Sequence, residues 1–262
     1  MTYLLHSIRM LYKSAAQYRA SFVMQICSQL IMVGGDLLAV LVLMDRFTQL
    51  GRWQPAEILF FFGMMQLTFA FTECFGRGIT TFCSFVGSGD FDTMLIRPRP
   101  LLLQVICHRL DARRIGGAAV GVTALVLASS HLQLVWTWEK LLALLLSSVG
   151  SLLLLLGLFL IEATVSFFSV RSIEMVNVLT YGGRTACQYP VDIYPDPIKL
   201  LFTWVAPFAL CMHLPVSWVL GRPMFDVPVW CVFLAPAAGA AFCVMMIFVW
   251  YVGVKHYRST GT

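Results

Sequence analysis

Long apolar runs separated by short polar segments make up most of this chain. A helix of about 20 mainly apolar residues is enough to cross the hydrocarbon core of a bilayer. The runs are too long and too continuous for the strands or amphipathic helices of a soluble domain. The pattern therefore predicts six membrane spans, at about residues 20–44, 56–82, 103–130, 139–168, 175–190 and 228–253.

The first residues follow a different pattern. Between residues 3 and 18 the apolar side chains recur at helical spacing on one face, while His6, Arg9 and Lys13 lie on the other. A helix of this kind lies in the plane of the membrane interface. We predict an interfacial helix over residues 1–18, with a solvated helical leader as the alternative.

The segment between the fifth and sixth runs is apolar but rich in proline. Proline removes a backbone donor and clashes with the preceding turn, so a continuous helix cannot pass through several of them. A free external loop would be more polar. We therefore expect a re-entrant pair of short helices over residues 189–220, bent at Pro190, Pro195, Pro197, Pro207 and Pro215.

Composition agrees with this pattern. Of the 262 residues, 59% are hydrophobic and only 12% are charged, against roughly 25% charged in soluble domains. The fold class is an all-α polytopic membrane protein, with residues 1–262 forming one transmembrane domain. The 8 cysteines are scattered without the clustered spacing of a metal site, so we predict no metal ligands.

The basic residues orient the chain. Cytoplasmic loops carry an excess of lysine and arginine. With both termini inside, most of the 18 basic residues fall on the cytoplasmic side. The exceptions are Arg46, Arg52, Lys140, Arg184, Lys199 and Arg222.

The most informative stretch is GDFDTMLIRPRP, from Gly89 to Pro100. It is a charged segment between the second and third runs, in a chain that is otherwise almost entirely membrane. Asp90 and Asp92 suit the first turn of a short helix, whose amide groups carry partial positive charge. Pro98 and Pro100 would end that helix.

GDFDTMLIRP, together with YPVDIYPDPIKLLFTWVAPFALCMHLP from Tyr189 to Pro215, resembles the permease subunits of type-2 ABC transporters. The resemblance covers nearly the whole chain. It implies two copies of a cytoplasmic ABC ATPase, a second permease subunit that is identical or a sister chain, and a bacterial inner membrane. It also implies that residues 83–102, which we call the coupling segment, receive the motion of the ATPase. The expected coupling residues are Asp90, Phe91, Asp92, Met94, Leu95, Arg97, Pro98 and Arg99.

The sequence does not indicate a catalytic activity or a nucleotide-binding site in this chain. It has no GxxxxGK[ST] phosphate loop, no HExxH and no GxSxG motif, so we expect ATP and Mg²⁺ to bind the partner ATPase and no cofactor to bind here. Membrane lipid is an expected partner and nucleic acid is not. An ATP-independent channel or scaffold is the main alternative, and a lipid-modifying enzyme finds no matching set of residues.

Charged residues within spans cost roughly 2.5–3.5 kcal/mol each at mid-helix on insertion scales, so each needs a reason. Glu73 and Arg77 are four residues apart and can pair on one helix face. Asp36 and Glu162 have no partner nearby in sequence, so either could line a path or meet an arginine of another helix. The candidates for the gate or path are Asp36, Glu73, Arg77, Glu162, Arg184, Tyr189, Pro190, Pro207 and Phe208. The resemblance implies export of a small hydrophobic or amphiphilic compound, such as a drug, a lipophilic cation or a lipid-linked molecule.

Overall fold

The computed structural model describes residues 19–46, 49–168, 176–223 and 227–257. These residues are helical or lie in short connections, with one isolated bridge between Leu50 and Trp53. The interfacial helix predicted over residues 1–18 lies outside the described part of the chain.

Five helical stretches in the described residues are long and apolar enough to cross a membrane, or six if one bent pair counts as a span. The predicted all-α membrane fold is therefore confirmed. The long helices are α2 (Arg19–Arg46), α3 (Pro55–Thr80), α7 (Ile115–His131), α8 (Trp138–Val165) and α13 (Ala235–His256). The first span stretch is Ala20–Val42, the second continues through α4 to Gly87, and the third and last begin in the 3-10 turns η1 (Ala112–Arg114) and η6 (Val229–Leu234).

Local signals fix several helix ends. Pro55 occupies the first turn of α3, and the Glu57 carboxylate accepts a hydrogen bond of 2.7 Å from the Gln54 amide, the reciprocal half of a capping box. Short helices α4 (Phe82–Gly87), α5 (Asp90–Leu95) and α6 (Leu101–His108) follow α3. Gly89, with φ of 74°, makes the left-handed turn between α4 and α5 that other residues adopt only with strain.

The third predicted span, residues 103–130, is divided in the structure. Its first part is the separate helix α6, and the spanning helix starts only at Ala112. The charged residues from Arg109 to Arg114 explain the difference, because they place this stretch at the edge of the apolar layer instead of within it.

The fifth predicted span, residues 175–190, is not among the long helices. Residues 176–186 are helical, a length of about 16 Å at 1.5 Å per residue, and residues 169–175 before them lie outside the described part. The helix widens into a π-helical turn at η2 (Val178–Gly182) and ends after α10 (Gly183–Ala186). Within the described residues this helix is shorter than a membrane span, and it passes through Gly182 and Gly183 before it ends at Ala186.

The proline-rich region forms the bent pair of short helices that its sequence predicts. Two helical arms, Asp196–Val205 and Ala209–Val219, meet at 85°, with Pro207 in the break. Pro215, another expected bend, lies within the second arm instead. The elements are η3 (Val191–Ile193), α11 (Asp196–Leu200), η4 (Leu201–Val205), η5 (Ala209–His213) and α12 (Leu214–Val219).

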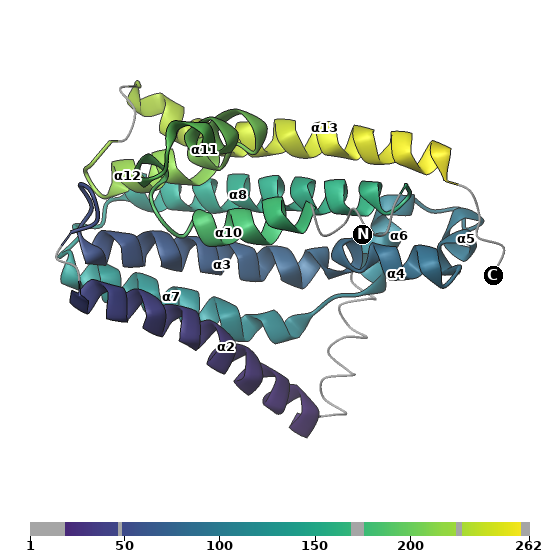
Figure 1. Cartoon of the computed structure of the whole chain (residues 1–262), viewed down its shortest axis with the longest axis horizontal. Coiled ribbons are helices and arrows are strands. Elements are labelled where there is room, and N and C mark those ends of the chain that lie inside the picture. The colour runs from purple at the N-terminus through teal and green to yellow at the C-terminus, as the bar shows by residue number, and fades with distance from the viewer. Residues whose placement is uncertain (1–18, 47–48, 169–175, 224–226, 258–262) are drawn as a thin grey trace.

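The long helices pack side by side in the order α13, α8, α3, α7 and α2 (Figure 1). Glycines allow two of these pairs to approach closely. A Cβ built on Gly239 of α13 would lie 2.0 Å from the Gly150 carbonyl oxygen of α8, and one on Gly121 would lie 3.0 Å from the Gly63 carbonyl oxygen of α3. Close backbone contact replaces the hydrophobic effect as the main attraction between helices in lipid.

The two ends of this bundle differ. The bent pair gathers at one end, and α4, α5 and α6 gather at the other, where α13 also finishes (Figure 1). Helix α2 is the least enclosed span, with 11% of its most apolar window buried, and it slants away from α3 toward its first residues (Figure 1).

Candidate functional site

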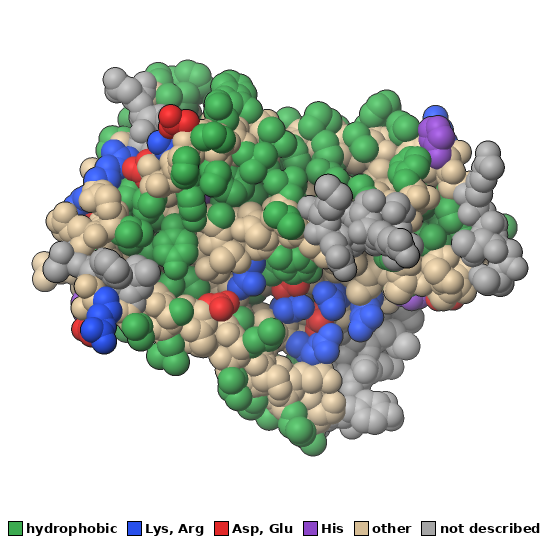
Figure 2. Space-filling model, in the orientation of Figure 1, with side chains coloured by type: hydrophobic (Ala, Val, Ile, Leu, Met, Phe, Trp, Pro, Cys, Tyr) green, Lys and Arg blue, Asp and Glu red, His purple; other side chains and the backbone are tan. Residues whose placement is uncertain are grey.

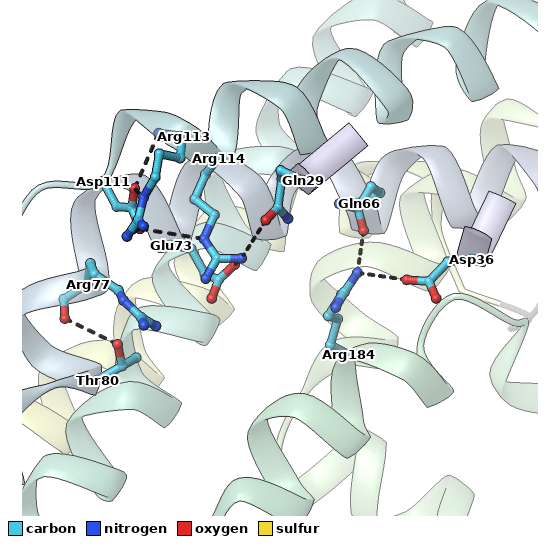
Figure 3. A network of polar contacts seen from close by, with 10 residues as sticks. All are labelled: Gln29, Asp36, Gln66, Glu73, Arg77, Thr80, Asp111, Arg113, Arg114 and Arg184. Atoms are coloured by element: carbon cyan, nitrogen blue, oxygen red, sulfur yellow. Dashed lines mark hydrogen bonds and ion pairs between the residues drawn. The ribbon is translucent and has the colours of Figure 1, made fainter. Parts of the chain in front are cut away.

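A network of polar side chains connects α2, α3, the segment before α7, and α10 (Figure 3). Its members lie within or at the edge of the apolar layer, where such groups are costly and usually functional. Charged side chains gather beside α2 on the face drawn in Figure 2. The network contains Gln29, Asp36, Gln66, Glu73, Arg77, Thr80, Asp111, Arg113, Arg114 and Arg184 (Figure 3).

Arg184 of α10 occupies the part of the network nearest the middle of the spans. Its guanidinium donates to the Gln66 side-chain oxygen at 2.5 Å and lies 3.5 Å from an Asp36 carboxylate oxygen. It also stands 4.6 Å over the Phe69 ring, a favourable cation–π contact. Asp36 thus meets an arginine of another helix, the second of the two roles that its sequence left open.

Glu73 is paired differently from the sequence prediction. Its buried carboxylate lies 2.9 Å from Arg114, whose guanidinium also donates to Gln29 at 3.4 Å. The expected ion pair between Glu73 and Arg77 is not formed. An (i, i+4) pair is worth only a few tenths of a kcal/mol on a helix surface, and the 3-10 turn η1 before α7 brings Arg114 to the Glu73 carboxylate instead.

Asp111 holds the segment that carries these arginines. Its backbone amide donates to the Cys74 carbonyl at 3.1 Å, and its carboxylate accepts two hydrogen bonds from Arg113 at 2.5 and 2.6 Å. Burial opposes ionisation here, but the hydrogen bonds and charge of Arg113, with the charge of Arg114, hold the pKa of Asp111 below its usual value. The carboxylate is therefore ionised at neutral pH.

Arg77 and Glu162 remain incompletely satisfied. The Arg77 Nε and one Glu162 carboxylate oxygen are buried without a hydrogen-bond partner, although Arg77 acts electrostatically on Glu162. Unmet buried polar atoms normally cost about 1–3 kcal/mol each. The Nε of Arg184 is also buried without a partner, so Arg77 and Arg184 in the network, and Glu162 of α8 beside it, have capacity left for a ligand, water or a second conformation.

The coupling segment projects from the end of the bundle that lies away from the bent pair. Asp90 and Asp92 occupy the first turn of α5 as predicted, and Asp90 accepts a hydrogen bond of 2.7 Å from Ser88. Gln104 donates to the carbonyls of Met94 and Arg99 at 3.2 and 3.1 Å. These bonds fix the path of the chain from α5 to α6.

Two of the expected coupling residues point inward. Phe91 and Met94 are buried, and the Phe91 ring packs on Phe82, Phe167 and Tyr257 with centroids 4.9, 5.6 and 4.9 Å away. They therefore do not belong to the exposed surface of the coupling segment. The exposed apolar residues are Leu95 and Ile96, at 45% and 84%.

Tyr257 ties the coupling segment to the end of α13. Burial and the neighbouring Asp92 carboxylate raise the pKa of its hydroxyl, which places Asp92 close to that group. Arg97, Pro98 and Arg99 remain exposed beyond α5. The segment thus has an anchored inner face and an exposed outer face.

At the opposite end, His213 connects the two parts of the proline-rich region. Its ring nitrogens lie 3.2 Å from the Phe208 carbonyl and 3.1 Å from the Tyr189 carbonyl, and its ring stacks on Phe61. Phe208 is fully buried against Phe202. The candidate residues Tyr189, Pro190, Pro207 and Phe208 therefore surround one bend, with Phe208 turned into its own chain.

The bent pair also contacts the long helices directly. Ser147 of α8 donates to the Cys211 carbonyl at 2.9 Å, and the Cys211 thiol lies 3.6 Å from the Ala235 carbonyl at the start of α13.

In the described part of the chain, no group of three or more His, Cys, Asp or Glu side chains could hold a metal ion.

Sequence reasoning missed Asp111, Arg113, Arg114 and Gln66 as members of the network. A usable signal existed for the first three, because charges from Arg109 to Arg114 fall inside an apolar run. The positive-inside pattern assigns those arginines only to the cytoplasmic excess of positive charge.

These features define a polytopic α-helical membrane protein with a polar network along its spans and a structured segment projecting from one end. The family model described as "ABC-2 family transporter protein" matches residues 30–261. The chain belongs to this family, and it is a membrane permease of an ABC transporter. Membership implies partnership with an ABC ATPase. No curated protein and no solved structure matched the chain.

Proposed function

We propose that this chain is the transmembrane subunit of an ATP-driven exporter in a bacterial inner membrane. Two permease chains, identical or sister chains, work with two cytoplasmic ATPases that bind ATP and Mg²⁺. The transported compound is small and hydrophobic or amphiphilic. Binding energy and hydrolysis come from the ATPases, and this chain supplies the path.

The observation that carries the proposal is the two-sided structure of α5. Its outer face offers Leu95 and Ile96 together with exposed arginines, a mixture typical of the centre of a protein interface. On its inner face, Phe91 packs into the aromatic cluster that includes Tyr257. A force that the ATPase applies to the outer face is therefore transmitted through Phe91 and Tyr257 to the end of α13.

The other end supplies the outer gate. The bent pair closes over the bundle there, and His213 ties its second arm to the Tyr189 carbonyl. Between the two ends, the network from Asp111 to Arg184 lines one side of α2. Because α2 is little enclosed, it is the span that can move with the least loss of packing.

The co-purification of an ATPase tests the proposal against the rival channel or scaffold. We expect the tagged full chain, expressed from its native locus, to bring down an ATPase with a phosphate loop and ATP hydrolysis activity. An unrelated polytopic protein with the same tag is the control. Pure permease that moves a solute without any ATPase or ATP would support the channel instead.

The orientation makes a separate prediction. Helix α2 begins and α13 finishes at the end that carries α5 (Figure 1), which is the side rich in arginine. In a variant without native cysteines, Arg97→Cys should resist an impermeant maleimide in intact cells, and Asp196→Cys should react. Opening the cells should make both react. Labelling of residue 97 in intact cells would reverse the orientation.

A further inference from the structure

A cavity of about 240 Å³ lies between α2, α3 and the segment before α7. It is in the region beside α2 where charged side chains gather (Figure 2). Its lining residues are Gln25, Ser28, Gln29, Met32, Arg77, Asp111, Arg113 and Arg114. Helix α2 thus contributes neutral polar groups and the other two elements contribute the charges.

Positive charge dominates this lining. Three guanidinium groups face one carboxylate, and that carboxylate already accepts two hydrogen bonds from Arg113. The nearby Glu73 carboxylate is likewise engaged by Arg114 at 2.9 Å. A cation entering the cavity would meet three like charges and no free acid, whereas an anion would meet favourable charge on several sides.

The arginines are held in place before any ligand arrives. Asp111 fixes Arg113, and Glu73 with Gln29 fixes Arg114 (Figure 3). Arg77 differs, because its buried Nε has no hydrogen-bond partner among the described residues. A guanidinium donates five N–H groups in a planar fork that matches phosphate oxygens. Arg113 and Arg114 are paired with carboxylates, whereas Arg77 forms no ion pair with the described residues, so its terminal N–H groups are the ones left to meet an anion in the cavity.

The surroundings favour an amphiphile over a free ion. The cavity is smaller than the roughly 300–1,000 Å³ of a site that encloses a drug-sized ligand, so it holds a head group and not a whole lipophilic molecule. Met32 lines it, and the neighbouring Ile31 is 77% exposed on the uncovered side of α2. An acyl tail can lie along that side while the head group stays among the arginines.

We propose that this cavity binds the phosphate head group of an anionic amphiphile, with Arg77 as its principal ligand. That this amphiphile is transported rests on the proposed function. Of the three substrate classes that the family resemblance implies, the site excludes the lipophilic cation, because no free carboxylate lines the cavity to bind it. A resident anionic lipid would offer the same chemistry.

Binding to the purified full chain in a maltoside detergent tests the proposal. The probes are dihexanoyl phosphatidic acid, dihexanoyl phosphatidylcholine and inorganic phosphate, measured by calorimetry. We expect phosphatidic acid to bind most tightly, and Arg77→Gln to weaken that binding about tenfold to a hundredfold through loss of charged hydrogen bonds. Arg77→Lys should recover part of the affinity.

Arg109→Gln is the matched control, because Arg109 is exposed near the same end but does not line the cavity. Equal loss in Arg77→Gln and Arg109→Gln, equal affinity for all three probes, or no binding of phosphatidic acid would overturn the proposal. The thermal midpoint of each variant should match that of the unaltered chain, which shows that Arg77→Gln acts on binding and not on folding.

The same probes distinguish the two sources of the ligand. With the ATPase present in the complex, stimulation of ATP hydrolysis by bound phosphatidic acid identifies transported cargo. Binding without stimulation identifies a resident lipid. If the chain binds phosphatidic acid but has no ATPase partner, the proposed function fails and the site stands. If an ATPase co-purifies but Arg77 does not affect binding, only the site fails.

Discussion

Replacing Leu95 and Ile96 together by serine should abolish substrate-stimulated ATP hydrolysis while the chain still inserts into the membrane. The two side chains are 45% and 84% exposed at the tip of the coupling segment, and neither supports the fold. Central apolar residues of an interface contribute about 2 kcal/mol or more each when they are hot spots, so losing both, about 4 kcal/mol together, should weaken ATPase binding about a thousandfold. Hydrolysis in reconstituted vesicles and ATPase affinity for the purified permease measure the two effects.

Phe168→Ser is the control for this variant. Phe168 is an exposed aromatic residue, 66% accessible, that lies beside His256 at the same end of the bundle but outside α5. It should retain hydrolysis and ATPase binding. Full activity in the double serine variant, or equal loss in the control, would show that α5 is not the docking element.

Glu73→Gln should destabilise the chain by about 3–5 kcal/mol, because it removes the closest counter-ion of Arg114, whose other carboxylate neighbour, Asp111, lies 3.9 Å away. Arg114→Gln should lower the stability by a similar amount, because it leaves the buried Glu73 carboxylate without its arginine partner. The double variant should recover most of the loss, since two neutral side chains replace a pair whose attraction was offset by its desolvation. Thermal midpoints in detergent for the four chains measure the coupling between the two residues.

Additive losses in the double variant would contradict this expectation and place each residue in an independent contact. Arg109→Gln again serves as the comparison, because it removes one exposed arginine from the same region without breaking an ion pair in the structure. Its midpoint should change little, as is usual for exposed charges.

The long spans were predictable because length and apolar content alone decide them. Residues 56–82 and 139–168 were expected, and α3 with its extension and α8 occupy nearly those positions. The bend at Pro207 was also predictable, since the chemistry of proline is local. The partner of Glu73 was not, because Arg114 is brought to it by the packing of α7 on α3 and not by helical spacing.

Which face of α5 points toward the bundle could likewise not be predicted from the local sequence. The sequence of α5 indicates a short helix with acids in its first turn, and the structure has one. Nothing in it says which side chains face the bundle, because Phe91 is turned inward by contacts with Phe82, Phe167 and Tyr257. Residues that are distant in the chain decide which face remains for a partner.

The anchoring of Phe91 on Tyr257 has a mechanical consequence. Helix α13 has 22 residues, a rod of about 33 Å. A tilt of about 5° at the anchored end displaces the far end by about 3 Å over that length. The far end is Ala235, whose carbonyl touches Cys211 of the bent pair. A tilt of a few degrees at the α5 end of α13 would therefore move its other end, on the opposite side of the membrane, by about 3 Å.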